Sequence, residues 1–201
     1  DVDEITTIQK VGLLDQGQYE RAESADSYLN IKDNFWLGNR HSSSYFRYVS
    51  SSGSLLGYST SDSLGVRAVI KISDITITGG DGTLSSNYKT ADKATNTSDV
   101  QVGEYINVPY IGSDNACGAD NLCTFRVVSK DNDSIKVVLN GLLPTISQYG
   151  STKIKLSNKI YTPLNTFANS ISSNYRYTNN KTFYIGAYSS GANYKDVQDE
   201  T

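Results

Sequence analysis

The stretch Thr124-Phe-Arg-Val-Val-Ser-Lys-Asp-Asn-Asp-Ser-Ile-Lys-Val-Val-Leu-Asn140 carries the strongest structural signal in the chain. Two apolar runs flank the turn Lys130-Asp-Asn-Asp, which predicts a β-hairpin. Asp and Asn tolerate the left-handed backbone that a tight reversal needs. In the second run the apolar residues alternate with Lys136, which we expect on the solvent side. The residues expected to face the core are Phe125, Val127, Ile135, Val137 and Leu139.

Two further segments have the strand pattern. In Gly65-Val-Arg-Ala-Val-Ile-Lys-Ile the apolar residues recur at every second position, so we expect Arg67 and Lys71 on the outer face. The segments Tyr45–Val49 and Leu55–Tyr58 flank the turn Ser51-Ser-Gly-Ser and predict a second hairpin. The inward positions of the first segment are Val66, Ala68, Ile70 and Ile72.

Helix signals are few. Asp15 can cap a helix that starts near Gln16, with Gln18 completing a capping box. Thr162-Pro163 predicts a second helix start, with Thr as N-cap and Pro at the first helical position. The sequence therefore predicts an α+β fold, mostly antiparallel sheet with two short helices. The buried residues of the second helix are expected to be Leu164, Phe167 and Ile171.

The composition indicates an extracellular protein. Ser, Thr and Asn together number 61 of 201 residues, and there are 15 Tyr against 5 Phe and 1 Trp. Tyr tolerates half-buried sheet surfaces because its hydroxyl can stay in water. The net charge of −3 and the lack of basic clusters argue against a nucleic-acid partner. No run reaches the roughly 18 apolar residues that would predict a membrane span.

Cys117 and Cys123 are the only cysteines, and His41 is the only histidine. Their C-x₅-C spacing fits neither a C-x₂-C redox motif nor a zinc ligand set. We therefore predict a disulfide that closes a small polar loop, formed in an oxidising compartment. Calcium bound by Asp114 and Asp120 is the less favoured interpretation of this loop; otherwise we predict no metal and no cofactor.

The segment Thr83–Asp99 contains only two large apolar residues, Leu84 and Tyr88. Such a segment buries too little apolar surface to offset the entropy of ordering it. We therefore predict a polar linker over residues 83–99, which would be the most protease-sensitive part of the chain.

The N-terminal segment Val11-Gly-Leu-Leu-Asp-Gln-Gly-Gln-Tyr-Glu-Arg-Ala resembles the "RLPTEAEWEYA" segment of the formylglycine-generating-enzyme-like branch of the C-type-lectin-like fold. The family's Pro is replaced by Leu14. Phe35-Trp-Leu, Gly65-Val-Arg-Ala-Val-Ile and Ile77-Thr-Gly-Gly-Asp-Gly-Thr resemble later motifs of such a domain in surface proteins of Gram-positive gut bacteria. The resemblance implies a C-type-lectin-like fold, in which Arg67 could pair with a carboxylate inside the sheet.

The segments that resemble the first half of this domain come second in the chain. They are Val102-Gly-Glu-Tyr-Ile and Cys123–Val138, followed by Phe183–Tyr194, which resembles the family's middle segment. The resemblance therefore implies that residues 1–82 are a late half, residues 83–99 the linker, and residues 100–201 an early half of the same or the next domain. Joining Thr201 to Asp1 would restore the family order.

Each half alone would leave apolar faces and strand edges exposed. We therefore expect Val102–Leu139 to share a sheet with Phe46–Ile72. The two halves can close within one chain, as in a circular permutant, or between neighbouring copies, which would propagate as a fibre. Of these two alternatives, we favour the second.

No catalytic residues are predicted, because the reactive cysteines of formylglycine-generating enzymes fall late in that domain whereas Cys117 and Cys123 fall in the early half. The calcium-binding Glu-Pro-Asn and Gln-Pro-Asp tripeptides of sugar-binding lectins are also missing from the sequence. We therefore expect a structural or adhesive module of a bacterial cell-surface protein, secreted and without enzymatic activity.

This module would be one unit of a tandem array or fibre, with neighbouring copies and host or cell-wall glycans as candidate partners. A pilin-type filament head and a carbohydrate-binding head are the alternatives. For the latter, a concave patch of exposed tyrosines would serve as the ligand platform, and the candidates are Tyr45, Tyr48 and Tyr58.

Overall fold

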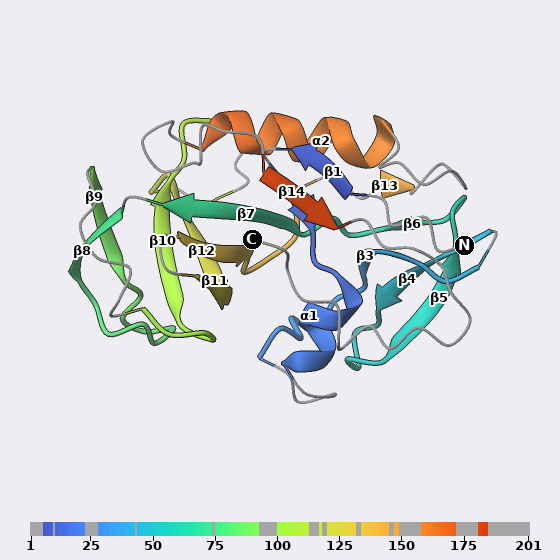
Figure 1. Ribbon diagram of the computed structural model, residues 1–201, viewed down its shortest axis with the longest axis horizontal. Helices are drawn as coiled ribbons and strands as arrows, with labels where there is room; N and C mark the ends of the chain where they lie inside the picture. Colours follow the sequence, from blue (N-terminus) through green and yellow to red (C-terminus); the bar gives the residue numbers. More distant parts are fainter. Residues whose placement is uncertain are drawn as a thin grey trace.

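The computed structural model describes residues 6–9, 11–22, 28–42, 44–73, 75–92, 100–112, 117, 120–131, 134–144, 147–148, 158–171 and 181–184. Within these ranges the fold is mostly antiparallel sheet with two helices, so the α+β prediction is confirmed (Figure 1). The elements are β1 (Thr6–Gln9), β2 (Gly12–Leu13), α1 (Gln16–Arg21), β3 (Phe35–Arg40), β4 (Tyr45–Val49), β5 (Leu55–Ser59), β6 (Ser63–Leu64), β7 (Ala68–Ser73), β8 (Ile75–Gly79), β9 (Lys89–Asp92), β10 (Tyr105–Pro109), β11 (Leu122–Lys130), β12 (Ser134–Leu139), β13 (Ser147–Gln148), α2 (Asn158–Ser170) and β14 (Lys181–Tyr184).

The central sheet has five strands in the order β10-β11-β12-β7-β2. The predicted hairpin is its middle, because β11 pairs antiparallel with β12. Strand β12 then pairs antiparallel with β7, with Ile135 opposite Ile72 and Val137 opposite Ile70. The expected sheet between Val102–Leu139 and Phe46–Ile72 therefore exists, and the single chain forms it on its own.

The strands nearest the two chain ends also pair with each other. Strand β1 runs antiparallel to β14, with Thr6 opposite Tyr184 and Gln9 opposite Lys181. Residues 6–9 and 181–184 are thus neighbours in space although they lie far apart in the sequence. Asp1 and Thr201 themselves lie outside the described residues.

The central strands β7 and β12 are buried on both faces. On one face Ile70 and Val137 belong to a large core with Leu164 and Phe167 of α2 and with Ile171, the residue after α2. On the other face Val69 and Val138 pack in a second core that includes Tyr19 of α1 and residues of β3 and β4. Figure 1 shows α2 above β7 and α1 below it.

Two residues expected on the solvent side of the sheet are buried on the side of the second core. Arg67 and Lys136 were expected in solvent, but their exposed fractions are 0% and 8%. Alternation correctly predicted which residues share a face, including Val66, Ala68, Ile70 and Ile72, all of which are buried. It could not predict that α1, β3 and β4 cover the opposite face.

Both helices form, one of them with a different start. The side chain of Asp15 accepts a hydrogen bond from the Gln18 amide at 2.7 Å, and the side-chain oxygen of Gln18 accepts one from the Asp15 amide at 3.2 Å, so the capping box is confirmed. Helix α2 begins at Asn158 rather than at Pro163. Pro163 therefore lies inside the helix, where it has no amide to donate to the carbonyl of Lys159 and its ring crowds that carbonyl.

The described part of the predicted linker is ordered. Tyr88 is 8% exposed, and its amide donates to the Tyr105 carbonyl at 2.9 Å. Strand β9 pairs antiparallel with β8, with Thr90 opposite Ile77. Residues 83–92 therefore belong to the fold through backbone pairing, which their polar side chains did not indicate. Residues 93–99 lie outside the described residues.

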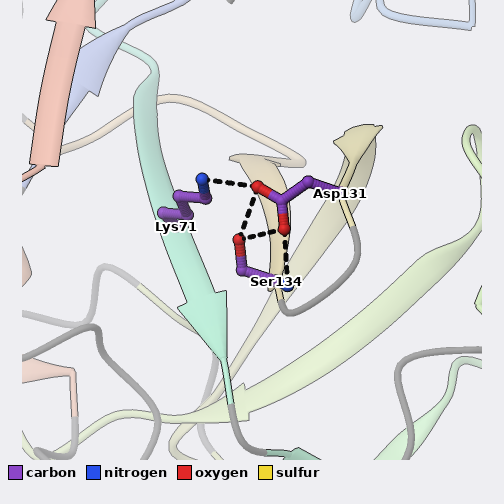
Figure 2. A network of polar contacts seen from close by, with 3 residues as sticks. All are labelled: Lys71, Asp131 and Ser134. Atoms are coloured by element: carbon purple, nitrogen blue, oxygen red, sulfur yellow. Dashed lines mark hydrogen bonds and ion pairs between the residues drawn. The ribbon is translucent and has the colours of Figure 1, made fainter. Parts of the chain in front are cut away.

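A small polar network closes the β11–β12 hairpin (Figure 2). The Asp131 carboxylate accepts hydrogen bonds from the amide and the hydroxyl of Ser134, each at 2.7 Å. It also forms an ion pair with Lys71 of β7, with 2.6 Å between the charged atoms. Since Lys71 is directly opposite Lys136 in the sheet, the carboxylate also offsets the repulsion between two neighbouring lysines.

The predicted disulfide is confirmed. Cys117 and Cys123 are bonded, and their Cα atoms are 4.6 Å apart. Both cysteines are buried in the core beside β11. The bond therefore anchors the loop before β11 to the core.

We predict that replacing both cysteines by serine lowers the free energy of unfolding by about 2.4 kcal/mol, the chain-entropy value for so short a loop. Urea denaturation followed by circular dichroism would measure this loss. Reductant applied to the unmodified protein is expected to produce a similar loss and to leave the double serine variant unchanged. A variant as stable as the unmodified protein would contradict the prediction.

Candidate functional site

The candidate site is one face of the three-stranded sheet β3-β4-β5. Strands β4 and β5 pair without a bulge, with Phe46 opposite Tyr58 and Tyr48 opposite Leu56. Because successive side chains in a strand point to opposite faces, these four residues share one face. Together with Trp36 of β3 we call this surface the aromatic face.

The rings of the aromatic face contact one another. The centroids of Tyr48 and Tyr58 are 5.3 Å apart, with the ring planes tilted by 47°. Trp36 contacts both rings, at 6.5 and 6.4 Å, and has no exposed surface. Trp36 is therefore a core residue, and the rings of Tyr48 and Tyr58 pack against it.

The outer part of this face is exposed and apolar. Leu56 is 45% exposed and Tyr58 is 40% exposed, while Tyr48 is half-buried. Large apolar side chains exposed side by side are typical of binding surfaces. Leu56 was not among the predicted platform residues, although its position two residues before Tyr58 in a strand places it on the same face.

The structure separates the three tyrosines proposed as a platform. Tyr48 and Tyr58 lie together, but Tyr45 is three residues from Tyr48 in a regular strand, so it points to the opposite face. Tyr45 is 45% exposed. Two of the three predicted residues therefore form the candidate site, and the third does not.

His41 lies on the face opposite to the aromatic face. A Cβ atom added at Gly57 would collide with the imidazole ring of His41, so the ring covers Gly57 closely. Burial lowers the pKa of His41, and the neighbouring positive charge of Arg47 lowers it further. His41 is therefore neutral at pH 7 and half-buried.

Arg67 is the main buried charge among the described residues. Its Nε donates to the Leu139 carbonyl at 2.6 Å and its Nη1 to the Leu29 carbonyl, while the guanidinium carbon lies 5.2 Å from the centre of the Phe35 ring. Burial lowers the pKa of Arg67 to about 9, and the charge of Arg126 adds to this effect. The side chain stays protonated at pH 7, and its partners in the described part of the chain are carbonyls and a ring rather than a carboxylate.

Arg126 on β11 has a similar structural role. Its guanidinium carbon lies 3.9 Å from the centre of the Tyr105 ring and 4.9 Å from that of Tyr28. Its nitrogen atoms donate to the Gly103 carbonyl and the Tyr105 hydroxyl. Burial lowers its pKa. The two arginines thus join the segment Tyr28–Leu29 to the central sheet through cation–π contacts and backbone carbonyls.

The candidate calcium loop is largely outside the described residues, including Asp114, and Asp120 is exposed. Within the described ranges no group of three or more His, Cys, Asp or Glu side chains is placed to hold a metal ion. In the same ranges no helix is long and apolar enough to cross a membrane. No family model, no curated protein and no solved structure matches this chain.

Proposed function

We propose that this chain is an extracellular adhesive module of a bacterial surface protein, with a C-type-lectin-like fold in permuted order, and that its aromatic face contacts carbohydrate. The exposed pair Leu56 and Tyr58, backed by Tyr48 and Trp36, is the observation that carries the proposal. The disulfide supports an oxidising, extracellular location.

The chemistry of the aromatic face favours a neutral sugar. A pyranose ring has an apolar side of C–H groups that can stack on a tyrosine ring, while its hydroxyls accept and donate hydrogen bonds at the ring edge. Tyr supplies both the flat apolar surface and a hydroxyl. Strand β5, Leu-Leu-Gly-Tyr-Ser, contains no charged residue. A neutral ligand that covers this strand therefore does not have to remove water from a charged side chain of β5.

Two features support the permuted lectin-like fold. Strand β7 of the late half is paired with β12 of the early half, and β1 is paired with β14. The second pairing brings together segments that would be consecutive in the family order. A module completed in this way is self-contained, so an array of such modules would be a string of closed units.

We predict that Tyr58→Ala reduces binding to glycans by at least about 5-fold, because a truncated aromatic anchor costs more than about 1 kcal/mol of binding free energy. A glycan array with neutral host glycans and cell-wall fragments would identify ligands of the unmodified protein. Titration of the best ligand would then give the ratio of the dissociation constants.

Tyr45→Ala is the matched control, since Tyr45 is as exposed as Tyr58 but lies on the opposite face. We expect this control to bind with unchanged affinity. Binding lost equally in both variants, or no glycan binding by the unmodified protein, would refute the carbohydrate-binding proposal.

A further inference from the structure

Strand β5 is the edge of its sheet, and its outward backbone groups can be assigned. The Ser50 amide donates to the Ser54 carbonyl at 2.9 Å, and the Thr60 amide to the Ser44 carbonyl at 3.3 Å. In an antiparallel pair the hydrogen-bonded positions alternate, so Leu56 and Tyr58 are bonded to β4. The N–H and C=O groups of Leu55, Gly57 and Ser59 therefore point away from β4.

These outward groups are nearly free of partners. Among the described residues, the only hydrogen bond to them outside the β4–β5 ladder is from the Asp62 amide to the Ser59 carbonyl, at 3.1 Å. Figure 1 shows β5 on the outer side of β4, far from the central sheet. Strand β5 thus presents both donors and acceptors to a further strand.

The side chains of β5 do not protect this edge. Natural edge strands avoid pairing through charged residues, prolines, bulges or a covering segment. Strand β10, at the edge of the central sheet, has Pro109 and is covered by residues 88–90, since the Asn107 amide donates to the Tyr88 carbonyl at 2.9 Å. Strand β5 has no charge, no proline and a regular ladder.

We propose that β5 pairs antiparallel with β5 of a second copy of this chain, with Gly57 opposite Gly57 across a two-fold axis. In this register the outward groups face each other: Gly57 exchanges two hydrogen bonds with its counterpart, and each Ser59 amide donates to the Leu55 carbonyl of the other copy. The pairing is isologous, so it closes at two copies.

The register is self-complementary for the side chains as well. Leu56 of one copy lies directly opposite Tyr58 of the other, because both are one residue from Gly57. The exposed Leu56 and Tyr58 are thus covered at their sides by apolar partners, while the faces of the rings stay accessible. The five residues of β5 in a second copy therefore provide hydrogen-bond partners for the outward backbone groups and apolar contacts for Leu56 and Tyr58.

Two aromatic faces would then form one continuous surface. A repetitive glycan could engage both faces at once, which raises the overall affinity through effective concentration. The pairing itself stands on the backbone of β5 and is independent of the ligand.

Sedimentation velocity over a range of concentrations tests the pairing. The unmodified protein is expected to reach twice the mass of a single chain. Leu56→Lys places charges at the contact, and Ser59→Pro removes an outward N–H that the single chain does not use; each is expected to weaken association at least 10-fold. Tyr45→Lys, at a residue with the same 45% exposure as Leu56, is expected to associate like the unmodified protein.

Cysteine cross-linking tests the register. In the proposed pairing, Leu56 and Tyr58 of different copies form a non-hydrogen-bonded pair, whose Cα separation of about 4.5 Å allows a disulfide. A mixture of Leu56→Cys and Tyr58→Cys is expected to give a covalent dimer on oxidation, in much higher yield than either variant alone. The native cysteines do not interfere, since both are in the Cys117–Cys123 disulfide.

A monomer at every concentration would overturn the proposal, as would association that Leu56→Lys leaves unchanged or cross-linking equally efficient with Tyr45→Cys. Failure of the carbohydrate proposal is distinguishable from these outcomes. Ser59→Pro keeps the Tyr58 ring, so it is expected to lose self-association while each chain retains its own glycan affinity.

Discussion

Arg67→Ala is expected to lower the free energy of unfolding by about 4 kcal/mol, a large share of the 5–15 kcal/mol typical of a domain. The arginine has no exposed surface, so truncation leaves a cavity between the two cores. It also removes the donors to the Leu139 and Leu29 carbonyls and the contact with Phe35. Urea denaturation monitored by Trp36 fluorescence would measure the change.

Arg67→Met separates the two contributions. Methionine refills part of the volume without a charge, and replacing a buried charge by an apolar side chain removes its desolvation cost. We expect Arg67→Met to lose about 2 kcal/mol, roughly half the loss of the alanine variant. An Arg67→Ala protein within 1 kcal/mol of the unmodified one would show that this side chain does not hold the two cores together.

Gly80→Ala is expected to lower the free energy of unfolding by about 3 kcal/mol. Gly80 has a φ of 87°, a conformation that residues with a side chain rarely adopt. An added Cβ atom would also collide with the Asn87 carbonyl and lie 2.9 Å from the Tyr88 Cα atom. These are backbone atoms of the ordered segment that contains Tyr88, so relief requires that segment to move.

Gly79→Ala is the control for this variant. A Cβ atom at Gly79 meets nothing within 4 Å, and its φ is not in the left-handed region. We expect a change within about 0.5 kcal/mol for this neighbouring residue. If the two variants lose the same free energy of unfolding, the close approach of residues 87–88 to Gly80 does not determine the effect.

The features predicted from the sequence are those that depend on neighbouring residues. The hairpin of β11 and β12 follows from two alternating runs and an Asp-Asn-Asp turn. The capping box at the start of α1 needs only Asp15 and Gln18. The close spacing of Cys117 and Cys123 was sufficient to predict their disulfide.

The missed features depend on segments distant in the sequence. Arg67 was placed in solvent because an alternating strand has the same pattern whether its second face is open or covered by another layer. Residues 89–92 pair with β8, and Tyr88 is held by backbone hydrogen bonds to Tyr105 and Asn107; backbone contacts of this kind are not evident from the side chains in the sequence. Pro163 marked the start of α2 too late, because α2 begins at Asn158 and continues through the proline, although proline is favoured only at the first helical position.

For the candidate site, the sequence indicated tyrosine-rich strands but not their register. Tyr48 and Tyr58 belong to adjacent strands, and their contact depends on the β4–β5 pairing, in which Tyr48 is opposite Leu56. Tyr45 is also a tyrosine of β4, but its side chain points to the opposite face. Its odd spacing of three residues from Tyr48 indicates this, whereas its closeness to Tyr48 in the sequence suggested a shared face.

The pairing of β7 with β12 determines when the chain can fold. Ile72 and Ile135 are partners separated by 63 positions in the sequence, and Gly12 and Val69 are partners separated by 57. Contacts of such long range slow folding, because a large loop must close before the contacts form. The hairpin β11–β12 can form early, because its strands are close in the sequence. Strand β7 lies between β2 and β12, so its pairing is complete only after Ser134–Leu139 has been synthesised. During synthesis on the ribosome, the apolar residues of β7 therefore remain without their β12 partner until the second half of the chain emerges.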